Sequence, residues 1–287
     1  MDDISLNIVI GIGLVSGILG AMFGIGCGVF IVPAFTLLLH IPIHIAIGSS
    51  LIAIIANSLT ASYYYAKAQL INIKIGLLLE LATVPGALVG AFIVVFISSN
   101  LLSILFIFIL LGIAISMILL QPSGVQNLTN QPNTGKINDY ILEPLNMRIS
   151  NYFDNALNET IVYRVIRILW GLIASFFSGI ISSILGVGGG VIKIPVMRQL
   201  MCIPIKVAIA TSAFMLTITA TTGAIIYYYN GYIYPSLVAP LTVGAFVGSI
   251  VGSKLAQKVR SKVLELGFVI IVIIIALFML LQLTKIL

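Results

Sequence analysis

The sequence predicts an all-α polytopic membrane protein with two inverted repeats, each a Gly-broken re-entrant helical hairpin followed by three transmembrane helices. Three observations predict this class: the composition, apolar runs of membrane length, and a repeated pattern of Gly, Pro and Ser. Hydrophobic residues make up 60% of the 287 positions and charged residues 8%, whereas soluble globular proteins carry about 25% charged residues. Too few polar side chains are therefore present to cover a surface exposed to water.

Long apolar runs mark the expected membrane-spanning helices. They cover residues 43–66, 75–97, 101–120, 206–229 and 263–283. A helix rises about 1.5 Å per residue, so about 20 residues cross a hydrocarbon core of about 30 Å. The runs are apolar on all faces, which excludes the alternating strands of a transmembrane β-barrel. Helices remain as the way to satisfy the backbone in lipid.

An internal duplication appears when the chain is laid on itself with a shift of about 162 positions. The segment 24–33, GIGCGVFIVP, then falls on the segment 186–195, GVGGGVIKIP. Apolar composition alone does not produce such matches at Gly and Pro. We therefore expect a first transmembrane repeat at 1–120 and a second at 164–287. A polar cytoplasmic linker at 121–163, helical in part near its end, joins them.

Each repeat opens with a segment that glycines interrupt, at 8–39 and 166–201. Such a segment is too long for one ordinary span and short for two. Two short helices that meet at a Gly-rich tip inside the membrane are the simplest solution. Irregular backbone is tolerated at that depth only where protein or a water-filled cavity surrounds it.

Basic residues predict the orientation, because cytoplasmic loops collect Lys and Arg. With three crossings per repeat, a single side receives Lys67, Lys74, Lys136, Arg148, Arg164, Arg167, Arg198, Lys206, Lys254, Lys258, Arg260 and Lys262. The other side receives Lys285 alone. The charge of +6 is thus an orientation signal rather than a sign of nucleic-acid binding. Both termini are expected outside, and the second repeat is inverted relative to the first, as in many transporters.

The doubled motif resembles the sulfite exporter TauE/SafE family. It reads G-I-G-C-G-x4-P from Gly24 and G-V-G-G-G-x4-P from Gly186, and the resemblance covers both hydrophobic repeats. The family contains membrane transporters with two related halves, associated with export of sulfite and organosulfonates. The resemblance implies an anion permease without fixing its substrate, and Cys27 departs from a pure glycine run.

The glycine tips are the first candidate substrate site, because helix N-termini offer free N–H groups and a favourable dipole to an anion. The alternative is that these glycines only permit close helix packing. Cys27 is either a small residue that takes the place of Gly189 or a thiol that reacts with a sulfur substrate. The tip residues are Gly24, Gly26, Cys27, Gly28, Gly186, Gly188, Gly189 and Gly190.

Polar side chains on the following helices fall in matching positions and could complete an anion cage. They are Ser49, Ser50, Thr211 and Ser212, with Asn57, Thr60, Thr219 and Thr222 further along. For each, bonding to its own helix or to a neighbouring helix is the alternative.

Two ionisable residues fall inside the expected spans, where charge is costly and often functional. Lys193 lies about one turn beyond the second tip, where the first repeat has Ile31. It either holds the anion or extends to the interface. Glu80 is a candidate for proton coupling, and pairing with Lys74 is the alternative.

These features predict a secondary transporter, a permease or exporter, of a small anion: a sulfur-containing oxyanion or organosulfonate, moved by alternating access. An anion channel with a Gly-lined filter and a carboxylate transporter are the alternatives. No cofactor, metal site or enzymatic motif is expected, since His40 and His44 lack further ligands and no Walker A pattern is present. The expected partners are a small anion, the lipid bilayer, a coupling proton or Na+, and further copies of the chain in a homo-oligomer, but no nucleic acid. The expected location is the cell inner membrane.

Overall fold

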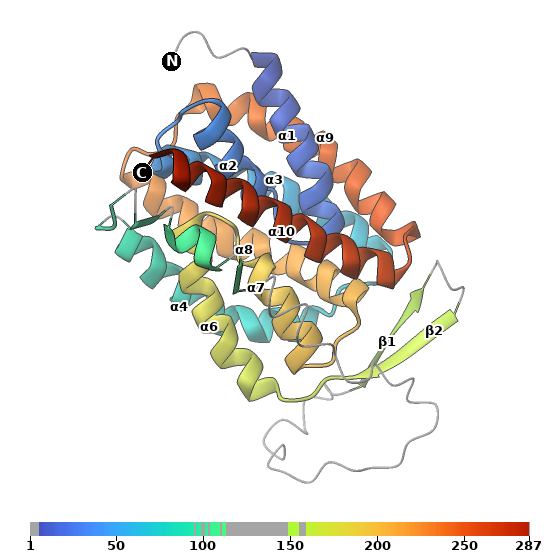
Figure 1. Cartoon of the computed structure of the whole chain (residues 1–287). Coiled ribbons are helices and arrows are strands. Elements are labelled where there is room, and N and C mark those ends of the chain that lie inside the picture. The colour runs from blue at the N-terminus through green and yellow to red at the C-terminus, as the bar shows by residue number, and fades with distance from the viewer. Residues whose placement is uncertain are drawn as a thin grey trace.

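The computed structural model describes residues 6–94, 96–98, 101–102, 104–109, 111–112, 149–154 and 159–286. Helices dominate them, as Figure 1 shows. The first repeat contains α1 (Leu6–Phe23), α2 (Gly28–Leu38), α3 (Ile43–Lys67) and α4 (Ile73–Val94). The second contains α6 (Ile168–Leu185), α7 (Gly190–Pro195), the π-helical turn η2 (Val196–Leu200), α8 (Ile205–Tyr229), α9 (Pro235–Lys258) and α10 (Ser261–Ile286). The predicted all-α polytopic class is confirmed, and much of the expected helix 101–120 lies outside the described residues.

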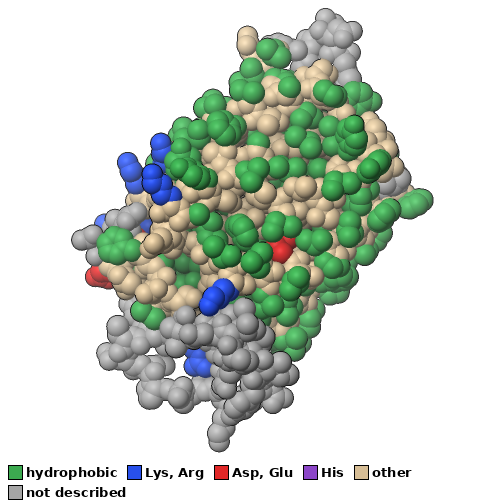
Figure 2. All heavy atoms as spheres, turned by 180° about the vertical axis from the view of Figure 1, so that it is seen from behind, with side chains coloured by type: hydrophobic (Ala, Val, Ile, Leu, Met, Phe, Trp, Pro, Cys, Tyr) green, Lys and Arg blue, Asp and Glu red, His purple; other side chains and the backbone are tan. Residues whose placement is uncertain are grey.

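Six helices in the described part of the chain are long and apolar enough to cross a membrane: α1, α3, α4, α6, α8 and α9. Their outer faces carry large exposed apolar side chains, among them Leu81, Phe92 and Trp170. Figure 2 shows apolar side chains over most of one face, with Lys and Arg gathered toward one end. Because an apolar surface of this extent is unfavourable in water, it is suited to contact with lipid.

The two Gly-broken hairpins have unequal arms. α1 and α6 each have 18 residues, whereas α2 has 11. The expectation of two short arms is therefore wrong for the first arm, since 18 residues extend about 27 Å. The reason is that the break follows Phe23 and Leu185, close to the middle of each segment, so the first arm fills the first half while the tip takes its residues from the second half.

The helices recur with the spacing of the sequence repeat. α6, α7, α8 and α9 each begin 162 positions after α1, α2, α3 and α4, at Ile168, Gly190, Ile205 and Pro235 against Leu6, Gly28, Ile43 and Ile73. Each of these four helices of the second repeat therefore has a counterpart in the first.

The equivalent helices α3 and α8 run in opposite directions through the bundle. Near the start of α3, the ring of His44 lies 5.3 Å from that of Tyr232, which follows the end of α8. At the other end of α3, the amide of Gln257 on α9 donates to the carbonyl of Tyr64 at 3.4 Å. Lys206 at the start of α8 donates to the carbonyl of Gln257 at 3.5 Å, so the end of α3 and the start of α8 share one end of the bundle.

Helices from different repeats pack most closely, α1 against α9 and α4 against α6. Glycines permit this approach. A Cβ atom at Gly17 on α1 would lie 2.5 Å from the carbonyl oxygen of Ala245 on α9. A Cβ at Gly179 on α6 would likewise meet the carbonyl of Thr83 on α4. α3 and α8 lie between these pairs and are the most deeply buried of the long helices.

A β-hairpin precedes the second repeat at the end of the bundle where α3 ends. β1 (Ile149–Asp154) pairs antiparallel with β2 (Glu159–Arg164), with Ile149 opposite Arg164. The expected partial helix near the end of the linker is therefore wrong. The sequences ISNYFD and ETIVYR explain the strands, because aromatic and β-branched residues favour a pleated, half-buried surface.

Candidate functional site

The two Gly-rich tips have nearly the same backbone geometry at two pairs of equivalent residues, and they differ at a third pair. Gly24 and Gly186 have φ of 65° and 64°, and Gly26 and Gly188 have φ of 80° and 77°. These values lie in the left-handed region, where a side chain is disfavoured. The third pair differs, because Gly189 has φ of 80° whereas Cys27 has φ of −69°. Cys27 therefore does not reproduce the conformation of Gly189.

The two tips meet in the centre of the molecule. A Cβ atom at Gly26 would lie 3.2 Å from the carbonyl oxygen of Val187, and one at Gly190 would lie 2.7 Å from the Cα of Ile25. A Cβ at Gly28 would meet the carbonyl of Gly186. The structure thus brings the two predicted tips together, with backbone against backbone at Gly26, Gly28 and Gly190, whereas a Cβ at Gly188 or Gly189 would meet side chains. Ile25 and Cys27 are fully buried there.

Matching serines bind each tip to the opposite repeat. Ser50 Oγ on α3 lies 2.8 Å from the carbonyl oxygen of Gly186, and Ser212 Oγ on α8 lies 2.8 Å from that of Gly24. Each hydroxyl donates to the carbonyl at the end of the opposite first arm, where the helix leaves its last acceptors unpaired. In this conformation the two serines therefore hold the tips rather than face a ligand.

Two tyrosines that were not predicted as site residues support the same region. Tyr65 OH donates to the carbonyl of Ala21 at 2.7 Å, and Tyr227 OH donates to that of Ser183 at 3.1 Å. Both tyrosines are buried. The two tyrosines are 162 positions apart, so they match under the shift that aligns the repeats. A buried tyrosine is as compatible with packing as with a binding site, so the sequence alone did not mark them as site residues.

The remaining predicted polar residues lie in the same core but have separate roles. Asn57 donates from Nδ2 to the carbonyl of Gly17 at 2.8 Å. Thr211 Oγ1 accepts from the backbone N–H of Asn72 at 3.0 Å. Ser49 is buried, and its Oγ makes no hydrogen bond within the described residues. Thr60 and Thr222 donate to their own helices, to Ala56 and Ile218.

A buried charged cluster lies beside the second tip. Lys193 Nζ on α7 donates to Glu80 Oε1 on α4 at 2.6 Å and to Thr219 Oγ1 on α8 at 2.7 Å. The Thr219 hydroxyl lies 2.9 Å from the same carboxylate oxygen. Lys193 is 1% exposed and Glu80 is 3% exposed, so the pair is removed from solvent. Its mutual attraction and hydrogen bonds must offset the desolvation of two ions.

This cluster decides between the alternatives for its two ionisable residues. Lys193 does not extend to the interface, because it is buried against Glu80. The alternative pairing of Glu80 with Lys74 is wrong. The two residues are six positions apart on α4, which at 3.6 residues per turn places them on different faces of the helix. Lys74 is exposed while Glu80 faces the core.

Within the described residues, no group of three or more His, Cys, Asp or Glu side chains is placed to hold a metal ion. His40 lies at the end of the first hairpin, and Cys27 and Cys202 are both free. The chemistry available at the tips is therefore that of backbone dipoles, hydroxyls and one buried ion pair.

The fold and the buried polar centre define a multi-pass helical membrane protein of the transporter class. Residues 9–279 match the model of the family described as Sulfite exporter TauE/SafE. The chain belongs to this family, whose resemblance was visible in the doubled glycine motif.

Curated relatives agree with this family. The chain is 27% identical over 236 residues to "Probable membrane transporter protein YunE" of Bacillus subtilis, covering 80% of each chain. It is 29% identical over 238 residues to a protein of Methanocaldococcus jannaschii with the same descriptive name, covering 80% of this chain and 76% of the relative. A shorter match of 91 residues at 36% identity links it to YdhB of Bacillus subtilis, over 32% of this chain and 36% of the relative. No solved structure matches the chain.

Proposed function

We propose that this protein is a secondary transporter that moves a small anion across the inner membrane by alternating access. The proposed anion is a sulfur-containing oxyanion, the class to which the sulfite of the family name belongs, or an organosulfonate. The observation that carries the proposal is the meeting of two equivalent Gly-rich tips beside a buried Lys193. The combination offers free helix N–H groups and one cation in a low-dielectric setting.

Lys193 is the residue that supplies positive charge beside the tips. It lies one turn into the second arm and is already held by Glu80 at 2.6 Å. When an anion enters between the tips, Lys193 is shared between the anion and Glu80. The charge of the substrate then offsets the desolvation of the ammonium group, and binding is selective for anions over neutral molecules.

Direct contact of the tips supports alternating access over an open pore. The backbone of one tip touches that of the other, and the serine bonds Ser50–Gly186 and Ser212–Gly24 hold both in place. An anion can reach the centre only when these contacts loosen on one side. A transporter that opens to each side in turn makes use of such a closure, whereas a Gly-lined filter would have to remain continuous.

Glu80 is the proposed site of proton coupling. Its carboxylate accepts from Lys193 and Thr219, both in the buried cluster. If Lys193 turns toward an anion, Glu80 keeps a buried negative charge with one partner fewer. Uptake of a proton by the carboxylate removes that unfavourable charge. The anion and a proton would then move together.

The proposed orientation places both termini and residues 40–44 outside, with the linker and residues 254–262 in the cytoplasm. It is supported by contacts at one end of the bundle, where Lys254 lies 5.2 Å from the ring centroid of Tyr64 and Lys206 lies 2.7 Å from Asp154 Oδ1. Figure 1 shows α1 beginning and α10 ending on the side of the bundle away from the β-hairpin. Basic residues are thereby grouped on the cytoplasmic side.

Transport itself is tested by uptake into proteoliposomes with a panel of sulfite, thiosulfate, sulfoacetate and acetate. We expect saturable uptake of at least one sulfur anion that increases with an imposed proton gradient. Lys193→Gln should reduce uptake strongly, and Lys193→Arg should retain part of it because the charge persists. Flux that does not saturate would favour a channel, and a preference for acetate would favour a carboxylate transporter.

Orientation is tested by labelling single cysteines from each side of the membrane in a Cys202→Ser background. Cysteines introduced at His44 and at Lys258 should react with impermeant reagents from opposite sides. Labelling of both positions from one side would contradict the three-crossing arrangement.

A further inference from the structure

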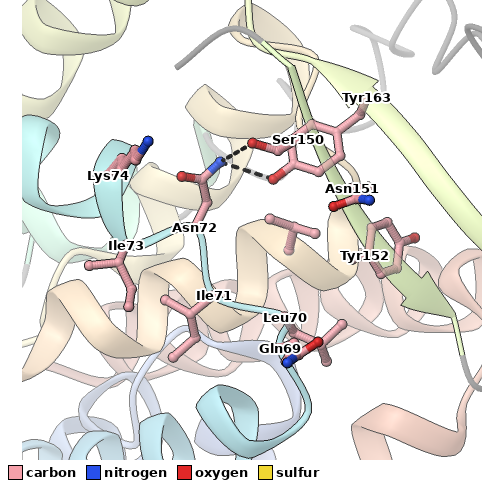
Figure 3. Close-up of a pocket in the computed structure, with 11 residues that line it drawn as sticks. Gln69, Leu70, Ile71, Asn72, Ile73, Lys74, Ser150, Asn151, Tyr152 and Tyr163 are labelled. Carbon is pink, nitrogen blue, oxygen red and sulfur yellow. Dashed lines mark hydrogen bonds between the residues drawn. The ribbon is translucent and has the colours of Figure 1, made fainter. Parts of the chain in front are cut away.

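A cavity of about 390 Å³ lies outside the tips, at the end of the bundle that carries the β-hairpin. We call it the hairpin cavity. Its walls come from three places: the loop between α3 and α4 with the start of α4, both strands of the hairpin, and Val207 at the start of α8. Figure 3 shows the loop on one side and the hairpin residues on the other. The size falls within the range of small-molecule sites.

The two walls are joined by Asn72. Its Nδ2 donates to Tyr163 OH at 3.0 Å and to Ser150 Oγ at 3.3 Å. Its Oδ1 accepts from the backbone N–H of Ile75 at 3.2 Å, which caps the start of α4. These bonds occupy the Asn72 side chain and fix the hairpin above the loop, so the cavity has a defined shape.

The other polar groups of the lining favour a negatively charged ligand. Lys74 supplies an ammonium group, and Gln69 and Asn151 supply side-chain amides. All three are exposed, and within the described part of the chain their side chains make no hydrogen bond or ion pair that an anion would have to displace. The described residues that line the cavity include no Asp or Glu. Amide and ammonium donors that line an open cavity match the acceptors of an oxyanion.

The acidic side chain of β1 is already paired. Asp154 at the end of the strand accepts from Lys206 at 2.7 Å, and both residues are buried. Burial raises the pKa of the Tyr163 hydroxyl, and its bonds to Asn72 and Ser150 oppose that shift only in part. The tyrosine therefore stays protonated and neutral at physiological pH, and the field inside the cavity is set by Lys74.

We propose that the hairpin cavity is a second binding site for a small oxyanion or organosulfonate, held by Lys74, Gln69 and Asn151 on the basic face of the bundle. The proposal rests on the proposed function for the class of anion. The cavity is connected to the core through Asn72, whose backbone N–H donates to Thr211 Oγ1 on α8. An anion held here is concentrated next to the helix that carries Ser212 and Thr219, before it enters the tips or after it leaves them.

The test uses the full chain, purified in detergent, with sulfoacetate as the probe. A Cys202→Ser, Ile73→Cys variant is labelled with a fluorescent maleimide, and the labelling rate is measured as sulfoacetate is added. Ile73 lines the cavity, is exposed and supplies no hydrogen-bond donor from its side chain. Cys27 is fully buried and should contribute no signal. We expect the anion to slow labelling at position 73 in a saturable way. Adding Lys74→Gln should raise the concentration needed for half protection by about tenfold, the effect of losing one charge-assisted hydrogen bond.

Lys258→Gln is the matched control, because Lys258 is an exposed lysine at the same end but is not among the residues that line the cavity. It should leave protection unchanged. An equal loss of protection in Lys258→Gln would show a general effect of surface charge and overturn the proposal. Absence of protection by sulfoacetate, or protection that survives Lys74→Gln, would also overturn it.

The result can be separated from that of the transport assay. Lys193→Gln should reduce uptake strongly while protection at position 73 persists, because Lys193 lies beside the tips and not in the cavity. Protection without any sulfoacetate uptake would retain the cavity as an anion site and reject transport of this anion. Uptake that is unaffected by Lys74→Gln, together with unchanged protection, would reject the cavity and retain the transporter.

Discussion

The two repeats match in backbone and differ in charge. Both tips have left-handed glycines at equivalent positions, with φ of 80° at Gly26 and 77° at Gly188. Both are held by a serine to the opposite repeat at the same distance of 2.8 Å. Where the second repeat has Lys193, however, the first has Ile31, which is fully buried. The two repeats therefore share the backbone conformation of their tips but differ in their buried charged side chains.

Each partner of Lys193 is also replaced in the other repeat. Thr242 on α9 stands where α4 has Glu80, and it donates to the carbonyl of its own helix at Val238. Asn57 stands where α8 has Thr219 and donates to Gly17. The equivalent residues of the first repeat are therefore uncharged, and the first hairpin still forms. The ion pair is not needed to form a hairpin, which favours a functional role for it.

The largest expected effect comes from converting the charged cluster into its neutral counterpart. Lys193→Ile alone, or Glu80→Thr alone, should lower the free energy of unfolding by about 3 kcal/mol or more, because each leaves an unpaired buried charge. The double variant Lys193→Ile/Glu80→Thr should recover most of that stability and still fail to transport. Thermal unfolding in detergent and uptake by proteoliposomes provide the two measurements.

The double variant is the decisive member of this set. If it transports as well as the unmodified chain, the ion pair is a structural feature and the functional contrast between the repeats is lost. If it remains as unstable as the single variants, the uncharged residues of the first repeat cannot replace the ion pair in the second.

A smaller effect is expected from substitutions at the one tip position at which the backbones differ. Gly189→Cys should lower the free energy of unfolding by about 1–2 kcal/mol, since a side chain in the left-handed region is disfavoured. Its Cβ would also lie 3.0 Å from that of Ser182. Cys27→Ala should cost about 1 kcal/mol or less, because the helical φ of Cys27 suits alanine and only one buried side-chain atom is lost. Equal losses in thermal stability would contradict this asymmetry.

The smallest effect tests the symmetric part of the comparison. Tyr65→Phe and Tyr227→Phe each remove a hydroxyl that donates to a buried carbonyl near a tip. Each should lower the free energy of unfolding by about 1 kcal/mol, the contribution of one hydrogen bond. The two losses should agree within the error of thermal unfolding. A much larger loss in one variant would show that the two tyrosines do not make equivalent contributions to the stability of the two repeats.

The fold class was predictable because it depends on patterns within short segments. Apolar runs define the spans, and the break after Phe23 follows from the glycines at 24, 26 and 28. The depth of Lys193 was predictable for the same reason, since it depends only on distance along the chain from the tip. The length of the first arm was misjudged because the tip takes its residues, 24–27, from the second half of the segment and leaves the first half to one helix of 18 residues.

Contacts between segments far apart in the chain were not predictable. Lys193 meets Glu80 across 113 positions, and nothing local identifies that partner. Helical geometry alone could have rejected Lys74 as the partner of Glu80. The serines were candidates either for an anion cage or for bonds to a neighbouring helix, and nothing local to the chain identified the carbonyls of the opposite tip that Ser50 and Ser212 bind. The hairpin was missed because polar composition outweighed the strand-forming residues Ile161, Val162 and Tyr163.

The pairing of α1 with α9 has a consequence for how the chain is made. α1 ends at Phe23, whereas α9 begins at Pro235, near the other end of the chain. During synthesis, which proceeds from the N-terminus, α1 enters the bilayer long before its partner exists. The face of α1 around Gly17 is therefore exposed to lipid until α9 has been synthesised and inserted. Assembly of the first repeat is therefore completed only when the second has been translated, and a chain truncated before α9 would retain α1 without the helix it is shaped to contact.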